Sequence, residues 1–136
     1  MKHQKENNNK NNTQYILFRG QKRHSKTWIY GVPFLTKSGK SVIITEWKKP
    51  LKIGIQFVKV KPKTITRYTG YKDLNGQLIF QGDILKDKEG TLFTVYYVAK
   101  QFHAGSRANF IDFDSFYNDY EDIEIINNIF DKPKKK

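Results

Sequence analysis

Short apolar runs separated by Gly, Asn and Asp fill the middle of the chain, and long helical periodicity is missing. This punctuation is typical of β-strands joined by tight turns. Apolar runs at residues 15–20 and 27–31 flank a polar segment and predict an opening hairpin. Residues 41–45 predict another strand after a turn at residues 37–40. We therefore expect a mainly β protein with, at most, short helical turns.

The apolar residues change parity within one predicted strand. They occupy odd positions from 53 to 57 but even positions from 58 to 61. Because side chains alternate faces along a strand, this change predicts a bulge or bend near Phe57. After the bend, alternate lysines would project together: Lys59, Lys61 and Lys63.

Turn signals are strongest in the second half of the chain. Asn75-Gly76 readily takes the positive φ of a tight hairpin, and Gly82-Asp83 predicts another reversal. Residues 92–98 are wholly β-branched, aromatic or aliphatic, which predicts a strand buried on both faces. Three elements are expected after it: a short strand at residues 110–113, a helical turn over residues 115–120 capped by Asp114, and a closing segment at residues 123–130.

The two ends of the chain differ in composition from its body. Residues 1–14 hold no apolar residue after Met1, so we expect a disordered polar tail, and residues 132–136 read as a frayed basic tail. The length of residues 15–131 suits a single domain. No run approaches the roughly 18 apolar residues of a membrane helix, and no secretory signal is visible. We expect a cytoplasmic protein with no membrane partner.

Charge is unevenly distributed. The 136 residues carry 25 Lys+Arg and 13 Asp+Glu, a net charge of +12. Residues 1–111 hold 21 Lys+Arg against 6 acids, whereas residues 112–131 hold 7 acids and no Lys or Arg. A basic body attracts a polyanion or an acidic protein. Solubility, or the codon bias of an AT-rich genome, would also account for the many Lys and Asn residues.

Nucleic-acid binding is the chemistry that the basic segments favour. Affinity would come from phosphate neutralisation and fall with salt, and Trp47, Phe57 and Tyr71 would stack on bases if exposed. No helix-turn-helix or zinc-finger signature is present, so we expect little sequence preference. The candidate nucleic-acid-binding residues are Arg19, Lys22, Arg23, Lys26, Lys48, Lys49, Lys52, Lys59, Lys61, Lys63 and Arg67.

An acidic strip near the end of the body supports the alternative hypothesis. A Ca²⁺ loop starting at Asp112 fails, because Ile123 stands where Glu is needed. The strip is a solvated edge, a partner for the basic body, or a mimic of nucleic acid that binds a host or phage protein. Its residues are Asp112, Asp114, Asp119, Glu121, Asp122 and Glu124.

Catalytic motifs find little support. With no Cys, thiolate nucleophiles and thiolate zinc sites are excluded. His103 and Ser106, in an expected Gly-containing loop, lack a visible orienting carboxylate or oxyanion donors. Gly39-Lys40-Ser41 lacks the first Gly of a phosphate-binding loop, because position 34 is Phe34. We expect no catalytic residues, no cofactor and no metal site.

Three segments, in order, carry a family resemblance. Residues 16–20 with 28–31 resemble an "FRG, then W-x-YG" signature. Residues 64–76 with 79–84 resemble "T-[IV]-x-x-YTG-x-KD-x-NG" followed by "I-[YF]-EGD-[IV]", and residues 125–131 resemble "[IV]-[IV]-GN-I-[YF]". Together they are similar to the YopX family of phage and prophage proteins. Gln81 replaces the usual Glu, and Asn127 replaces the usual Gly.

The resemblance implies an architecture and a biological setting. It implies a small SH3-like β-barrel over residues 64–131, preceded by a β-rich N-terminal portion at residues 15–63. It also implies a phage or prophage protein in a bacterial host cell, without naming a reaction. The matched aromatic residues would supply the centre of the core: Trp28, Tyr30, Tyr68 and Phe80.

Overall fold

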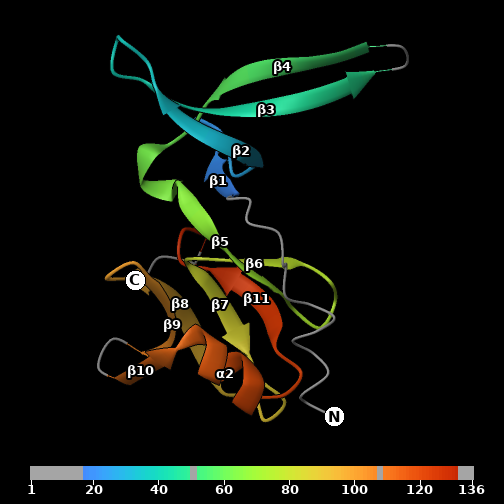
Figure 1. Ribbon diagram of the computed structural model, residues 1–136, viewed down its shortest axis with the longest axis vertical. Coiled ribbons are helices and arrows are strands. Elements are labelled where there is room, and N and C mark those ends of the chain that lie inside the picture. Colours follow the sequence, from blue (N-terminus) through green and yellow to red (C-terminus); the bar gives the residue numbers. More distant parts are fainter. Residues whose placement is uncertain (1–16, 50–51, 107–108, 132–136) are drawn as a thin grey trace. The chain divides into compact units, whose positions relative to one another are not determined.

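The computed structural model describes residues 17–49, 52–106 and 109–131, and the side chains of residues 47–53 lie outside that description (Figure 1). The two predicted tails, at residues 1–14 and 132–136, also lie outside it. Contacts divide the chain between Arg67 and Tyr68 into two compact units. We call them the N-terminal unit, with described residues 17–67, and the C-terminal unit, with described residues 68–131.

The N-terminal unit is an antiparallel sheet with the strand order β4-β3-β2-β1, and β1 also pairs with the start of β5. β1 pairs with β2, which confirms the predicted opening hairpin. The turn at residues 37–40 joins β2 to β3, which confirms the strand predicted after this turn. Its elements are β1 (Phe18–Gln21), β2 (Trp28–Leu35), β3 (Ser41–Lys49), β4 (Lys52–Lys59), the 3₁₀ helix η1 (Pro62–Thr64) and β5 (Thr66–Lys72).

The core of the N-terminal unit is small. Ile43 is fully buried, and Val42 and Val60 are nearly so. The backbone of Gln21 ties β1 to η1: its N–H donates to Thr64 Oγ1 at 2.8 Å, and its carbonyl accepts from the N–H of Lys61 at 2.8 Å. These bonds satisfy polar backbone groups where the sheet ends.

The bulge predicted near Phe57 is absent from the described part of β4, so that prediction is wrong. β3 and β4 pair without a register shift from Val42↔Lys59 to Lys49↔Lys52. The change of parity reflects apolar residues on both faces of one regular strand. Phe57 is exposed on one face, whereas Val58 is half-buried on the other.

The C-terminal unit contains a second antiparallel sheet with the strand order β10-β9-β8-β7-β11, while β6 pairs with the later part of β5. Its elements are β6 (Leu78–Phe80), β7 (Asp83–Lys86), β8 (Leu92–Val98), β9 (Gln101–Ser106), β10 (Asn109–Asp112), α2 (Phe113–Asp119) and β11 (Glu124–Asn128). A mainly β protein with short helical segments is thereby confirmed.

A closed SH3-like barrel is not confirmed for residues 64–131. Over the described residues β10 and β11 form the two edges of the C-terminal sheet, and the sheet does not close. Side chains of the helix α2 pack into the core formed by the strands, so helix packing covers apolar surface there. Phe116 of α2 is fully buried, and its ring centroid lies 4.7 Å from that of Phe93 and 5.1 Å from that of Tyr120.

The predicted aromatic centre is confirmed for two of its four members. Tyr68 and Phe80 are buried, with ring centroids 5.5 Å apart. Trp28 is half-buried, and Tyr30 is 43% exposed. The last two therefore do not serve as core residues in the described structure.

The predicted turns at Asn75-Gly76 and Gly82-Asp83 are confirmed. The carboxylate of Asp73 organises the first: it accepts the backbone N–H groups of Asn75 at 2.8 Å, Gln77 at 2.9 Å and Ile125 at 3.0 Å. Gly76 has the required positive φ of 82°. Asp73 thus fixes the β5–β6 hairpin and joins it to the start of β11.

Three predictions about the C-terminal unit need correction. The helix starts at Phe113 and its cap is Asp112, which accepts the backbone N–H of Ser115, so the assignment of the cap to Asp114 is wrong. Residues 101–106 form β9 rather than a loop. β8 exists as predicted, but it is not buried on both faces: only Val95 is buried, and the two end residues of the strand are exposed.

Candidate nucleic-acid interface

The predicted basic residues fall into three groups. Lys48, Lys49 and Lys52 have side chains outside the described structure. Arg19, Lys61 and Arg67 make local contacts within the N-terminal unit. The exposed members of the set are Lys22, Arg23, Lys26, Lys59 and Lys63.

Local contacts restrict three of the predicted cations. Arg19 is only 6% exposed, and its guanidinium carbon lies 3.9 Å from the centroid of the Trp28 ring. Lys61 is half-buried, and its Nζ donates to Gln21 Oε1 at 3.2 Å. Arg67 is half-buried with its guanidinium carbon 5.1 Å from the ring centroid of Phe18. These contacts place the three side chains in the structure of the sheet rather than at its basic surface.

The predicted ridge of alternating lysines is also wrong. Lys59 ends β4, Lys61 lies in the connection that follows, and Lys63 lies within η1. Strand alternation therefore stops at Lys59, and the three side chains do not share a strand face.

A basic pocket of about 190 Å³ gathers cations from three segments of the N-terminal unit. Arg23 follows β1, Lys40 ends the β2–β3 turn, and Lys59 ends β4. Backbone bonds hold these segments together, since the N–H of Arg23 donates to the carbonyl of Lys59 at 3.1 Å. The lining thus holds three basic residues and no acidic one, a charge balance that suits a phosphate. The other lining residues are Gly39, Ser41, Val60 and Pro62.

Sequence reasoning did not include Lys37 and Lys40 among the candidate binding residues. Both are exposed in the β2–β3 turn, and Lys40 lines the pocket. They were assigned to a turn and to a failed phosphate-loop motif rather than to a basic surface. A count of charges by segment would have found them. Residues 15–67 contain 13 Lys+Arg and a single acid, Glu46.

The three aromatic residues expected to stack on bases differ in their exposure to solvent. Phe57 is 58% exposed, whereas Tyr71 is buried in the C-terminal unit, and the side chain of Trp47 lies outside the described structure. In the described N-terminal unit two exposed rings were missed: Tyr30 was assigned to the core, and Phe34 was assigned no role. Both belong to β2.

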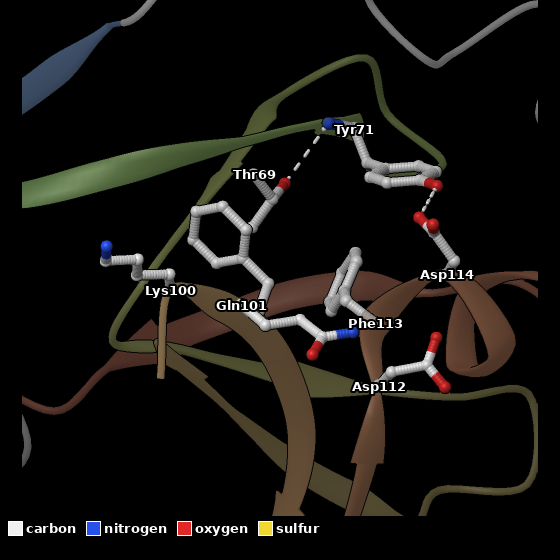
Figure 2. A pocket seen from close by; sticks show the side chains of 8 residues that line it. Thr69, Tyr71, Lys100, Gln101, Asp112, Phe113 and Asp114 are labelled. Atoms are coloured by element: carbon white, nitrogen blue, oxygen red, sulfur yellow. Dashed lines mark hydrogen bonds between the residues drawn. The ribbon is translucent and has the colours of Figure 1, made fainter. Parts of the chain in front are cut away.

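A second pocket, of about 180 Å³, lies in the C-terminal unit, and Figure 2 shows its lining. The Tyr71 hydroxyl donates to the Asp114 carboxylate, and the Tyr71 N–H donates to Thr69 Oγ1 at 3.1 Å. Asp112, also in the lining, caps α2. The two carboxylates of this pocket thus hold local structure.

The acidic strip is only partly exposed. Asp114, Asp119 and Asp122 are exposed, and Glu121 pairs with Lys88 across 3.4 Å. The N–H and the hydroxyl of Ser115 donate to Asp112 and hold the pKa of that carboxyl below its usual value. Glu124 is half-buried in β11. The structure therefore divides the strip between capping, ion pairing and solvent exposure.

The structure does not bring together the His103 and Ser106 pair considered in the sequence. His103 and Ser106 lie three residues apart on β9, so they face opposite sides of the sheet. Among the described residues, no group of three or more His, Asp or Glu side chains could hold a metal ion. No helix in the described chain is long and apolar enough to cross a bilayer.

Fold and charge together define an antiparallel β protein whose N-terminal unit gathers cations around a pocket. The sequence model of the YopX protein family matches residues 17–135. The chain belongs to the YopX family, as the three ordered motifs indicated. A comparison with curated proteins finds no match.

Proposed function

We propose that this protein is a non-enzymatic phage or prophage accessory protein that binds nucleic acid with little sequence preference. The observation that carries the proposal is that Arg23, Lys40 and Lys59 line one pocket of the N-terminal unit. A phosphate group matches this pocket in charge and in its need for several donors. No cofactor is required for binding of this kind.

The surrounding charge supports a polyanion over a small anion. Further exposed cations add to the positive surface of the same unit: Lys22, Lys26, Lys37 and Lys63. A single phosphate would use the pocket alone, whereas a nucleic-acid backbone would use the pocket and this surface together. Neutralisation of successive phosphates releases counterions and makes the affinity strongly dependent on salt.

The experiment is a fluorescence-anisotropy titration of labelled random DNA and RNA at several salt concentrations. The triple variant Arg23→Gln, Lys40→Gln, Lys59→Gln is compared with a control in the C-terminal unit, Lys86→Gln, Lys88→Gln, Lys100→Gln, which removes the same charge from exposed lysines. We expect the pocket variant to lower the slope of log affinity against log salt by about 2, at about 0.7–0.9 for each phosphate contact. The control should leave it close to wild type.

Two outcomes would contradict the proposal. Equal losses in both triple variants would mean that net charge alone attracts the nucleic acid. Absence of binding even at low salt would leave the cations as determinants of solubility.

Protein binding through the acidic strip is a second candidate, favoured by the exposure of Asp114, Asp119 and Asp122. Under this alternative a host or phage protein would bind in place of nucleic acid. Its complex would survive nuclease treatment and would be lost in the variant that changes these three residues to Asn.

A further inference from the structure

An exposed apolar face covers strands β2, β3 and β4 of the N-terminal unit. Large apolar side chains, which a sheet normally buries, are exposed to solvent on β2 and β4, the two strands that flank β3. The exposed fractions are 43% for Tyr30, 57% for Val32, 52% for Phe34, 62% for Ile55 and 58% for Phe57. Contiguous exposure of this kind marks a binding surface.

Strand register places these residues on the same face. Tyr30, Val32 and Phe34 are alternate residues of β2. Directly paired residues of antiparallel strands point to the same side of a sheet, and Val32 pairs with Ile44, which in turn pairs with Phe57. The rings of the two outer strands therefore belong to a single face.

The basic pocket adjoins this face through Lys59. Phe34 pairs with Val42, and Val42 pairs with Lys59, so a ring and a pocket cation lie in one cross-strand row. The single acid of the unit, Glu46, pairs with Ile55 on the same face and is exposed. The face thus combines aromatic rings, aliphatic side chains and a cationic border with one carboxylate.

This combination of exposed rings and cations suits single-stranded nucleic acid better than a duplex. A duplex offers phosphates, but its bases are already stacked on one another and cannot cover exposed rings. A single strand offers unstacked bases beside phosphates, and every base has a π-face that stacks on an aromatic side chain. The net positive charge of the unit complements this ligand and opposes a basic protein partner.

We propose that the face of β2, β3 and β4 is a stacking platform for single-stranded nucleic acid. Bases stack on Phe34 and Phe57, with Tyr30 as a third ring, and the backbone places a phosphate at Arg23, Lys40 and Lys59. This inference rests on the proposed function and narrows it from nucleic acid in general to single strands.

The test measures binding of a short oligothymidylate that carries 2-aminopurine, beside a duplex of the same length. Phe34→Ala and Phe57→Ala are compared with Leu35→Ala, which removes an exposed apolar side chain from the opposite face of β2. We expect each Phe variant to weaken single-strand binding roughly 5- to 150-fold, and to reduce the 2-aminopurine quenching caused by stacking. Leu35→Ala should change neither quantity.

Two further variants separate stacking from folding and from charge. Phe34→Trp and Phe57→Trp keep a ring at each position and should retain binding, whereas loss of fold would show in far-ultraviolet circular dichroism of the Ala variants. Glu46→Gln removes the only acid of the unit and should tighten single-strand binding a few-fold at low salt. Neither Phe→Ala change should alter the salt slope, because the phosphate contacts remain.

The possible failures are distinct. If the Phe→Ala variants behave like Leu35→Ala while the pocket variant still loses binding, the platform is refuted and the proposed function stands. A clear preference for the duplex would also refute the platform. If wild type binds neither form, both proposals fall, and a nuclease-resistant partner lost in the Phe variants would show that the face docks a protein instead.

Discussion

The two units are both built on antiparallel sheets, but they differ in net charge and in the solvent exposure of their phenylalanine rings. Residues 15–67 hold 13 Lys+Arg against one acid, whereas residues 68–131 hold 5 against 11. In the N-terminal unit Phe34 and Phe57 are exposed, while in the C-terminal unit Phe113 and Phe116 are buried. The difference in ring exposure follows from the helix α2, whose rings complete the core of the C-terminal unit. In the described N-terminal unit no α-helix covers the sheet, and an apolar face stays exposed to solvent.

The largest expected effect contrasts a buried ring with an exposed one. Phe116→Ala should lower the free energy of unfolding by about 3–5 kcal/mol, because it empties a fully buried position packed on other rings. Phe57→Ala should change it by about 0.5 kcal/mol or less, since its ring is exposed. Urea unfolding followed by circular dichroism measures both. A similar cost for the two variants would mean that Phe57 is part of a core.

The next largest loss of stability is expected at Gly31, where the backbones of β2 and β3 approach closely. A Cβ on Gly31 would clash with the carbonyl oxygen of Ile44, so Gly31→Ala forces β2 and β3 apart. We expect a loss of about 3 kcal/mol, at the upper end for overpacking. Both tryptophans belong to residues 15–67, so Trp fluorescence reports the unfolding of this unit.

Gly39→Ala is the matched control for that substitution. Gly39 has a positive φ of 87° but no atom within 4 Å of an added Cβ, so only the backbone conformation opposes the change. We expect a cost of about 1 kcal/mol. Equal costs at the two glycines would remove the steric explanation.

The buried carboxylate of Asp73 is expected to contribute to the stability of the C-terminal unit. Asp73→Asn should lower the free energy of unfolding by about 2 kcal/mol, because a charged acceptor of three backbone N–H groups is lost. Glu89→Gln, at an exposed position between β7 and β8, should be nearly neutral. Thermal unfolding near pH 7 distinguishes them, and an equal response would show that charge rather than hydrogen bonding matters.

The smallest effect is the pH dependence of the helix cap. The pKa of Asp112 is lowered by donation from Ser115, so the cap stabilises the fold above the unfolded pKa of about 3.9. This stabilisation is lost as the pH falls through the lower pKa of the folded state. Asp112→Ala should therefore be less stable than wild type near neutral pH, and the difference should vanish in acid. A difference that persists at low pH would argue for a role of Asp112 beyond its charge.

Local signals predicted most of the strands, because turn chemistry is encoded within a few residues. Asn75-Gly76 and Gly82-Asp83 are reversals in the structure as predicted. β9 was missed because residues 101–106 include Ala104, Gly105 and Ser106, which carry little strand propensity of their own. Pairing with β8 and β10 on either side makes this segment a strand.

The coverage of each strand face is decided by distant residues, and this is where sequence reasoning failed. The alternation around Phe57 was interpreted as a bend, although it only records that both faces of β4 carry apolar residues. Arg19 was placed with the surface cations, but stacking on Trp28 takes it into the sheet. The basic pocket could not be foreseen, because its three cations come from segments that only tertiary structure brings together.

The exposed face of β2, β3 and β4 has a practical consequence for handling the protein. Mutual repulsion between molecules with a net charge of +12 keeps such faces apart in dilute buffer. Concentrated salt, the usual means of stripping nucleic acid from a basic protein, screens this repulsion and strengthens apolar association. We expect solubility to fall at high salt and to recover when a short oligonucleotide is added, so that the ligand acts as a solubilising agent for its own receptor.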